Sequence, residues 1–288
     1  MRYLDAVATR AALSMEDAID AMRLAFADDR EHPQRVALAG SLFMPGRVGP
    51  VTGIKVVSVV PGNPAGIVVA FGPDGAPLGM VDGPTLTAIR TAAGAGLATS
   101  LMAPKQASVM AMLGAGAMAP DQVEAVRAVR PISRVVVWSR TPGKAANLAE
   151  RIGAESVKNA GMAVSQADII TTATPATMPL FEASDVRVGA HINAVGAFTP
   201  GMIEVPPALT KLAYTVVDDI DAAAAEAGDL LQAGKAADAT IGDLLAARAT
   251  VPPGITTLFK SVGIASQDVA AAEVALRHAA ARDLGVEL

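Results

Sequence analysis

Residues 107–126, with the sequence ASVMAMLGAGAMAPDQVEAV, constrain the fold of this chain more than any other stretch. The apolar run Val109–Leu113 predicts a buried strand, and the segment after the glycines has the periodicity of a helix. A strand, then G-x-G-x-x-A, then a helix is the context in which this glycine pattern indicates a dinucleotide-binding fold. In such a fold Gly114 would make the tight turn, Gly116 would admit a pyrophosphate, and Ala119 would let the helix pack closely.

The glycine pattern also has a plain alternative, because glycine and alanine are frequent along the whole chain, which contains 26 glycines. Its position between a strand and a helix favours the functional interpretation. The free N–H groups and the positive end of the helix dipole would then hold the phosphates. We therefore expect a dinucleotide to bind the loop formed by Gly114, Ala115, Gly116, Ala117 and Met118.

Composition narrows the class of protein. A chain of 288 residues with 52% hydrophobic and 18% charged residues is expected to be globular and to form two domains. The net charge of -5 argues against nucleic acid or an anionic membrane surface as a partner. With no cysteine and only three histidines, far apart in the sequence, we expect no disulfide and no metal site.

The sequence contains no pattern for membrane insertion. No apolar run approaches the ~20 residues that a membrane-spanning helix needs. The first residues lack the apolar core of a signal peptide, because Arg2, Asp5 and Arg10 interrupt them. We therefore expect a cytoplasmic protein without a membrane partner.

The part of the chain before the glycine motif predicts helices and an antiparallel sheet. Ser14 is suited to cap an amphipathic helix over residues 14–28, and an alanine-rich helix is expected over 86–102. Four strands are predicted between them, over residues 36–39, 53–60, 67–71 and 77–81. Turn residues separate these strands at Pro45-Gly46, Pro61-Gly62-Asn63-Pro64 and Gly72-Pro73-Asp74-Gly75.

From residue 107 onward, strand and helix patterns alternate, which predicts parallel strands joined by helices. The predicted strands are Val109–Leu113, 134–139, 168–174, 190–195 and 214–218. The expected helices are 121–129, 144–151, 162–166, 207–211, 222–232 and 241–247. A strand at 256–261 and a helix at Ala265–Arg282 close the chain, and we expect that helix to pack on the first layer.

These patterns predict an α/β protein in which a Rossmann-type, doubly wound parallel sheet is inserted into an α+β domain. Residues 1–106 would form the first part of the α+β domain. Residues 107–255 would form the Rossmann domain, and residues 256–288 would return to the first domain.

The end of the second Rossmann strand indicates which coenzyme is bound. In dinucleotide folds an acidic residue there accepts from the ribose 2′-hydroxyl and selects NAD. Here the strand VVVW is followed by Ser139-Arg140-Thr141, with Lys144 one turn later and no carboxylate among them. These groups suit a 2′-phosphate, so we expect NADPH in preference to NADH. The alternative is a charged turn that only contacts solvent.

Four pieces of sequence are more specific than these general patterns. They are Gly53-Ile54-Lys55, the run DGPTLTAIRTAA at 82–93, Phe259-Lys260-Ser261-Val262-Gly263, and Gln267-Asp268. Together with the glycine motif they make the chain resemble the ornithine cyclodeaminase/μ-crystallin family over nearly its whole length. The resemblance implies a homodimer built through the N-terminal sheet, with the first domain binding the substrate. It also implies activity on small amino or imino acids with a nicotinamide coenzyme.

The same resemblance implies that Arg35, Lys55 and Arg90 hold the substrate carboxylate. The residues themselves support two of these assignments. Lys55 lies in an otherwise apolar strand, and Arg90 is the only charge within residues 83–104. A buried arginine needs an anion, and its own helix offers none, whereas a substrate carboxylate would suffice. Arg35 has the alternative of being an ordinary loop charge.

The loop AVGAFTPG at 194–201 departs from the pattern of the deaminating family members. Those members have a catalytic aspartate where this chain has Phe198. Without that carboxylate, water or an amine has no obvious base to activate it, so deamination is in doubt. An apolar ring suits reduction of a preformed cyclic imine, and GAFTP resembles the loop of the cyclic ketimine reductases. The alternative is that Phe198 fills the core.

We therefore expect NADPH-dependent reduction of Δ1-pyrroline-2-carboxylate to L-proline, with Δ1-piperideine-2-carboxylate, giving L-pipecolate, as a second substrate. Lys55 is the expected proton donor, in competition with protonation of the imine by solvent. Thr91, by resemblance, would reach the coenzyme phosphates. The nicotinamide pocket would be formed by Thr174, Val195, Gly196, Ser261 and Gly263.

Two other functions stay open at this point. One is an amino-acid dehydrogenase, acting on alanine or a basic amino acid, or an ornithine cyclodeaminase of the same family. The other is a non-catalytic, NADPH-dependent ligand-binding protein like μ-crystallin. A carboxylate clamp at Lys55 and Arg90 argues against an inert binding protein.

Overall fold

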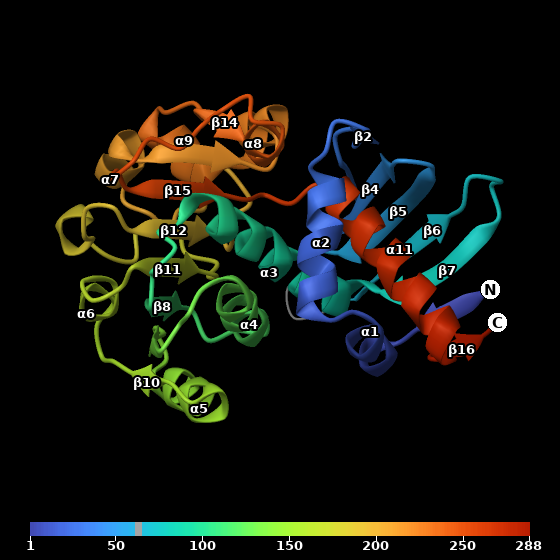
Figure 1. Cartoon of the computed structure of the whole chain (residues 1–288), viewed down its shortest axis with the longest axis horizontal. Helices are drawn as coiled ribbons and strands as arrows, with labels where there is room; N and C mark the ends of the chain where they lie inside the picture. The colour runs from blue at the N-terminus through green and yellow to red at the C-terminus, as the bar shows by residue number, and fades with distance from the viewer. Residues whose placement is uncertain (61–64) are drawn as a thin grey trace. The chain divides into compact units, whose positions relative to one another are not determined.

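The computed structural model describes residues 1–60 and 65–288, so the turn predicted at 61–64 lies outside the described residues. The chain divides into two compact units. The first consists of Met1–Gly94 with Ile264–Leu288, and the second is Ala95–Gly263. Each unit is built around its own eight-stranded sheet (Figure 1).

The sheet of the first unit contains an antiparallel meander, as the sequence predicts, but its strand at residues 41–48 was not among the four predicted strands. Its strands pair in chain order: β4 (Ser41–Val48), β5 (Val51–Ser58), β6 (Gly66–Phe71) and β7 (Pro77–Asp82). Short strands lie at its two sides. β1 (Arg2–Leu4) lies next to β7, with β16 (Val286–Glu287) beyond it, and β2 (Arg30–Glu31) and β3 (Val36–Leu38) lie next to β4. Because β1 pairs with β16, the two ends of the chain are neighbours (Figure 1).

The break predicted at Pro45-Gly46 is wrong. β4 continues through both residues, and the chain turns at Gly49-Pro50 instead. On one side Pro45 lies opposite Ile54 of β5. On its other side β3 and β2 pair only with residues 41–43 and 47–48, so Pro45 lies at an open edge among the described strands. Proline is tolerated in a strand at such edge positions.

The helices of the first unit are α1 (Ala6–Ala12), α2 (Met15–Ala25), α11 (Ala265–Arg282) and the beginning of α3 (Gly83–Met102). Of these, α1 and α11 contact the strands of the sheet. Ser14 caps α2 as predicted, because its Oγ accepts from the N–H of Asp17 at 3.2 Å. α11 crosses β4 to β7 and packs against α2 (Figure 1).

Two glycines set the distance between α11 and the sheet. Gly46 of β4 and Gly53 of β5 are cross-strand partners. A Cβ on Gly46 would lie 2.9 Å from Cβ of Ala265, and one on Gly53 would lie 3.1 Å from Cγ2 of Val269. The missing side chains therefore allow the first turns of α11 to lie directly on the strands, which places Asp268 against the sheet.

Gly46→Ala is expected to lower the free energy of unfolding by about 1–3 kcal/mol, because the added methyl group would overlap Ala265. Gly143→Ala is the matched control, since a Cβ at Gly143 meets no atom within 4 Å. Urea unfolding of both variants measures the difference. Equal stabilities would show that α11 does not lie this close to β4.

The second unit contains the Rossmann-type, doubly wound sheet that the sequence predicts. Its strands all run parallel, in the order β10–β9–β8–β11–β12–β15–β13–β14. They are β8 (Val109–Leu113), β9 (Arg134–Trp138), β10 (Glu155–Ser156), β11 (Ile169–Thr172), β12 (His191–Ala194), β13 (Tyr214–Val217), β14 (Ala239–Thr240) and β15 (Thr257–Lys260). Both faces are buried: Met110 and Met112 of β8 belong to one apolar core, and Ala111 and Leu113 to the other.

Helices connect these strands as expected, with differences at their bounds. They are α4 (Ala119–Val129), α5 (Pro142–Ile152), α6 (Ala160–Val164), α7 (Pro207–Leu212), α8 (Ile220–Glu226), α9 (Gly228–Ala233) and α10 (Ile241–Leu245), with a 3-10 turn at Ala183–Asp185. The single helix predicted at 222–232 is two helices that meet near Ala227. Gly228 begins the second, where a Cβ would lie 2.7 Å from the carbonyl oxygen of Thr199.

β15 lies inside the parallel sheet, between β12 and β13. Residues 256–263 were expected in the segment that returns to the first domain, but they belong to the second unit, and the return begins at Ile264. At the other boundary, α3 continues from the first unit into the second beyond Gly94.

Candidate functional site

A cluster of three buried charges lies in the first unit. Lys55 of β5 and Arg90 of α3 both bind Asp268 of α11, whose side chain is fully buried. Nζ of Lys55 lies 3.0 Å from Oδ1 and 2.9 Å from Oδ2 of Asp268. Nε of Arg90 donates to Oδ1 at 3.0 Å. One carboxylate therefore holds both of the basic residues that the sequence singles out.

The helix of Arg90 offers it no anion, as the sequence indicates, but Asp268 supplies one from a distant helix, α11. Gln267 adds a second bond by accepting from Nη1 of Arg90 at 3.2 Å. Nη2 of Arg90 has no partner among the residues that the structure describes. Nη2 and the second N–H of Nη1 are thus left for a ligand, and two such donors can bind a carboxylate with two hydrogen bonds.

The electrostatics of this cluster favour an anionic ligand. Burial, with smaller contributions from the charges of Arg90 and Arg35, lowers the pKa of Lys55 to about 8, although Asp268 opposes the shift. Burial alone would raise the pKa of Asp268, but the charges of Arg90 and Lys55 lower it below its usual value. At neutral pH two cations therefore share one anion. Arg35, half-buried just before β3, lies near enough to add its charge.

The glycine turn of the second unit has the shape of a phosphate site. Gly114 has φ of 117°, and its N–H donates to the carbonyl of Trp138 at 2.8 Å, which joins the ends of β8 and β9. A Cβ at Gly114 would lie 2.6 Å from the carbonyl oxygen of Ala173, so this position requires glycine. A Cβ at Gly116 would meet no atom within 4 Å, so the turn is open toward a ligand. These features fit a dinucleotide pyrophosphate at the start of α4.

The turn between β9 and α5 has basic groups without protein partners. The N–H of Thr141 donates to Oγ of Ser139 at 3.3 Å, which shapes the turn. Arg140 and Lys144 are exposed, and neither side chain forms an ion pair or hydrogen bond with the described part of the chain. The prediction that this turn binds a 2′-phosphate is compatible with that arrangement. Thr91, the remaining residue predicted to reach the phosphates, is buried in α3 of the first unit.

A buried carboxylate brings together the predicted nicotinamide-binding residues at the ends of β11 and β12. Oε1 of Glu204 accepts from the N–H and the hydroxyl of Thr174 at 2.7 and 2.8 Å. Oε2 accepts from the N–H of Gly196 at 2.8 Å, in the segment that begins with Val195. Phe198 follows in the same loop and is 43% exposed, so the alternative that it fills the core is wrong.

A second buried carboxylate holds the segment after β15. Oδ2 of Asp218 accepts from the hydroxyl of Ser261 at 2.9 Å and from the N–H groups of Val262 and Gly263 at 3.0 and 2.7 Å. Ser261 and Gly263 therefore have a structural partner. Whether they also border the nicotinamide remains a prediction from the sequence.

Sequence reasoning assigned no role to the acidic residues that organise these sites. They are Glu204, Asp218, Asp229 and Asp268, and the basic residue Lys260 belongs with them. All five are fully buried, although such residues are rarely buried without a charged partner. One local signal was present, because Glu204 and Lys260 each stand inside a short apolar segment. Their partners are distant in sequence and could not be read from it.

His191, the one histidine in the parallel sheet, has a structural environment. Its Nδ1 lies 2.8 Å from Oγ1 of Thr257, and its Nε2 lies 3.1 Å from Oδ1 of Asn193. Burial lowers the pKa of His191 to about 3, so the imidazole is neutral near pH 7 and is not suited to donate a catalytic proton.

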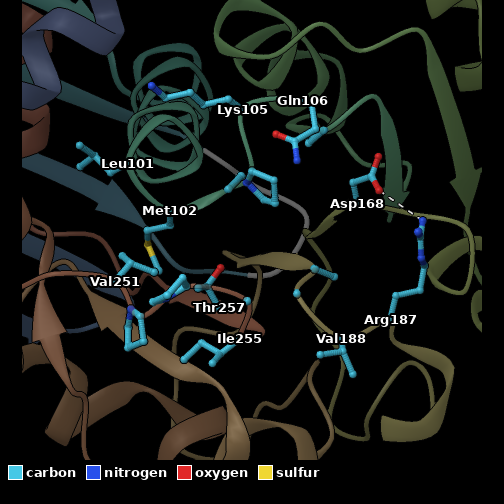
Figure 2. A pocket seen from close by; sticks show the side chains of 18 of the residues that line it. Leu101, Met102, Lys105, Gln106, Asp168, Arg187, Val188, Val251, Ile255 and Thr257 are labelled. Carbon is cyan, nitrogen blue, oxygen red and sulfur yellow. Dashed lines mark hydrogen bonds and ion pairs between the residues drawn. The ribbon is translucent and has the colours of Figure 1, made fainter.

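A pocket of about 610 Å³ lies in the second unit, at the amino ends of the parallel strands (Figure 2). Thr257 begins β15, and Asp168 precedes β11 and forms an ion pair with Arg187 at 3.2 Å. Ligands of open parallel sheets bind outside the carboxyl ends of the strands. This pocket is at the opposite edge from the glycine turn, so we do not assign it to the coenzyme.

Two kinds of feature are absent from the described residues. Within 1–60 and 65–288, no helix is both long and apolar enough to cross a membrane. The same part of the chain contains no group of three or more histidine, aspartate or glutamate side chains placed to hold a metal ion.

Known proteins resemble this chain over most of its length. A model of the ornithine cyclodeaminase/mu-crystallin family matches residues 4–282. A Delta(1)-pyrroline-2-carboxylate reductase of Bacillus cereus is 36% identical over 257 residues, covering 81% of this chain and 79% of that protein. The ketimine reductase mu-crystallin of Mus musculus is 34% identical over 219 residues, covering 75% and 70%. The solved Δ1-pyrroline-2-carboxylate reductase of Thermococcus litoralis, in complex with NADH and L-proline, has a TM-score of 0.94 at 27% identity over 100% of both chains.

Proposed function

We propose a function for this chain from one premise, which is that it belongs to the ornithine cyclodeaminase/mu-crystallin family. The chain would catalyse NADPH-dependent reduction of Δ1-pyrroline-2-carboxylate to L-proline. Δ1-Piperideine-2-carboxylate, the homologue with a larger ring, would be a second substrate. In this proposal the first unit binds the imino acid and the second unit binds the coenzyme. The names of its relatives as reductases of such imines support the proposal.

The observation that carries the proposal is the excess of positive charge at Asp268. Lys55 and Arg90 share this one carboxylate, so a buried cluster keeps a net positive charge. A buried charge is costly unless an opposite charge neutralises it. The carboxylate of a small imino acid on the open edge of Arg90 would provide that charge and two directed hydrogen bonds.

Reduction of the imine requires a hydride at carbon and a proton at nitrogen. The coenzyme, when bound, would supply the hydride. Arg90 would hold the substrate carboxylate and so fix the direction of the C=N bond, with Arg35 adding attraction. Nζ of Lys55 would donate the proton to the imine nitrogen, because a pKa of about 8 leaves it protonated at pH 7 and able to release the proton.

The loop after β12 favours reduction over deamination. Its aromatic residue, Phe198, is partly exposed and stands in the position where the deaminating family members have a catalytic aspartate. The nearest buried carboxylate in this loop, that of Glu204, already accepts four hydrogen bonds from the protein. We propose that Phe198 contributes an apolar surface that keeps water from the reacting imine.

Arg140→Ala is expected to weaken NADPH binding by about 10- to 100-fold and to leave NADH binding nearly unchanged, because a charged hydrogen bond to the 2′-phosphate is lost. Fluorescence titration with each coenzyme measures both constants. Arg151→Ala is the matched control, since Arg151 is also exposed but lies near the far end of α5, the helix that follows the Arg140 turn. An unchanged ratio of the two constants in Arg140→Ala would mean that the 2′-phosphate is bound elsewhere.

Initial rates in both directions test the proposed reaction. The purified chain should oxidise NADPH with Δ1-pyrroline-2-carboxylate, and more slowly or equally with the piperideine homologue. Oxidation of alanine, arginine or ornithine with NADP⁺ or NAD⁺ should be much slower. Strong oxidation of an amino acid without imine reduction would make the chain an amino-acid dehydrogenase. Binding of NADPH without turnover of either class would make it a binding protein.

The first unit also supports the proposal of a homodimer through the N-terminal sheet. Val36 and Leu38 of β3 are 57% and 65% exposed, at the outer side of β4. Large apolar side chains grouped at a sheet edge favour association. Light scattering should therefore give twice the chain mass of 29.1 kDa, and Val36→Lys with Leu38→Lys should reduce it. A monomeric wild-type chain would contradict this proposal.

A further inference from the structure

Three buried charged residues in the second unit have no part in the mechanism above. Glu204, Asp229 and Lys260 are each fully buried. Lys260 is the last residue of β15, and in the sheet it lies opposite Ala194, the last residue of the neighbouring strand β12. Asp229 belongs to α9, and Glu204 ends the loop that carries Phe198. The three residues form one network around that loop.

Glu204 connects the ends of two strands. Its Oε1 accepts from the N–H and hydroxyl of Thr174, which follows β11. Its Oε2 accepts from the N–H groups of Gly196 and Ala197, which follow β12, at 2.8 and 3.0 Å. Gly196 must be glycine for this approach, since a Cβ there would lie 2.6 Å from Oε1 of Glu204.

Asp229 and Lys260 hold the two ends of the loop. Oδ1 of Asp229 accepts from the N–H groups of Glu204 and Val205 at 2.7 and 2.8 Å. Nζ of Lys260 lies 2.8 Å from Oδ2 of Asp229 and also donates to the carbonyl of Ala197. The beginning and the end of the loop are thus bonded into one buried network that includes a single cation.

These bonds determine which hydrogen-bond donors at the strand ends remain for a ligand. The N–H groups of Gly196 and Ala197 and the hydroxyl of Thr174 all donate to Glu204, so they are not available as donors to a nicotinamide. Burial raises the pKa of Glu204. All four of its acceptor positions nevertheless face donors, and three of these donors are backbone N–H groups, which can only donate. The ionised carboxylate fits this arrangement, whereas an amide of the same shape would turn its own N–H groups toward other donors.

We propose that Glu204 is a positioning residue for the nicotinamide end of the coenzyme, acting through the loop from Val195 to Ile203. This inference rests on the proposed function, because it takes the carboxyl ends of β11 and β12 as the nicotinamide site. Glu204 touches neither coenzyme nor substrate in this account. It fixes the peptide planes at Gly196 and Ala197 and so determines which face of the loop, with Phe198, meets the ring.

Glu204→Gln separates this role from a general structural one. It keeps the shape of the side chain and leaves the Asp229–Lys260 pair intact, but it replaces two acceptor positions with donors. The matched control is Asp168→Asn, because Asp168 also accepts from two backbone N–H groups, those of Ser108 and Val109, at the opposite edge of the same sheet. Both variants should lose thermal stability.

The measurement compares the reduced coenzyme that the wild type binds with its nicotinamide-free fragment, 2′-phospho-ADP-ribose or ADP-ribose. In Glu204→Gln the fragment should bind as in the wild type, within about twofold. The whole coenzyme should bind about 10- to 100-fold more weakly, and the fluorescence of its bound nicotinamide should return toward that of free coenzyme. Asp168→Asn should preserve both the ratio of affinities and the fluorescence.

Three results would overturn the proposal: native nicotinamide fluorescence in Glu204→Gln, an equal loss for coenzyme and fragment, or the same pattern in Asp168→Asn. If Glu204→Gln does not fold, Glu204→Asp is measured in the same way, since its shorter carboxylate cannot reach both strand ends. Failure of both to fold would leave Glu204 a purely structural residue and also overturn the proposal. Because these readouts need no imine, a wild type that binds coenzyme but reduces no ketimine would contradict the proposed function alone.

Discussion

Lys55→Met is expected to lower kcat/KM for imine reduction by about 10²- to 10⁴-fold, because it removes the proposed proton donor. The variant should fold, since Asp268 keeps its bond to Arg90. Coenzyme binding should be unchanged, because Lys55 belongs to the first unit and the predicted phosphate sites at Gly114 and Arg140 belong to the second. Lys105→Met, which removes an exposed lysine of the second unit, is the control and should retain the wild-type rate.

The pH profile gives the same prediction a second test. Only protonated Lys55 can donate, so kcat/KM for reduction should fall as the pH rises above the pKa of about 8. Bound substrate adds a negative charge near Nζ, which raises this pKa, so the profile of kcat should fall at a higher pH than that of kcat/KM. A Lys55→Met variant with wild-type rate and profile would mean that solvent protonates the imine before it binds.

Asp268→Asn is expected to have the largest effect on stability. It leaves Lys55 and Arg90 buried next to each other without an anion, and breaking a buried pair in this way costs about 3–5 kcal/mol. For a chain of this size that corresponds to a fall in Tm on the order of 10 °C. Asp268 also raises the pKa of Lys55, so the alkaline limb of kcat/KM should move to lower pH in the variant.

Thermal unfolding with and without a carboxylate ligand measures this effect. L-Proline should raise the Tm of Asp268→Asn more than that of the wild type, because its carboxylate supplies part of the missing negative charge. Asp283→Asn is the control, since Asp283 forms an ion pair with Arg2 but is almost fully exposed, and it should change Tm little. A small effect of Asp268→Asn would show that the two cations are not neutralised by this carboxylate.

Patterns that are local in sequence were sufficient to predict most of the fold. The glycine turn, the parallel strands and α11 follow from the periodicity and glycine placement of short segments, and the structure contains them. Pro45 was misread as a break because its tolerance depends on which strands lie beside β4. α1 was not predicted, although Asp5 caps it by accepting from the N–H of Ala8.

The candidate site was predictable only in part. Lys55 and Arg90 were noticed because each is a charge inside an apolar segment, but their partner Asp268 is 178 residues from Arg90 in the chain. Glu204 and Lys260 give the same local signal and were passed over, because nothing in the sequence relates them to Thr174 or Asp229. Pairings of this kind depend on the register of strands and the packing of helices, which only the folded chain determines.

One measurement tests the central claim most directly, namely transfer of the coenzyme hydride to the imine carbon. The purified chain is incubated with Δ1-pyrroline-2-carboxylate and NADPH that carries deuterium at C4 of the nicotinamide, and the products are analysed by mass spectrometry. The account predicts proline that contains one deuterium at Cα, from one of the two faces of the nicotinamide. Absence of labelled proline with both deuterated epimers of NADPH, while the chain binds the coenzyme, would contradict it.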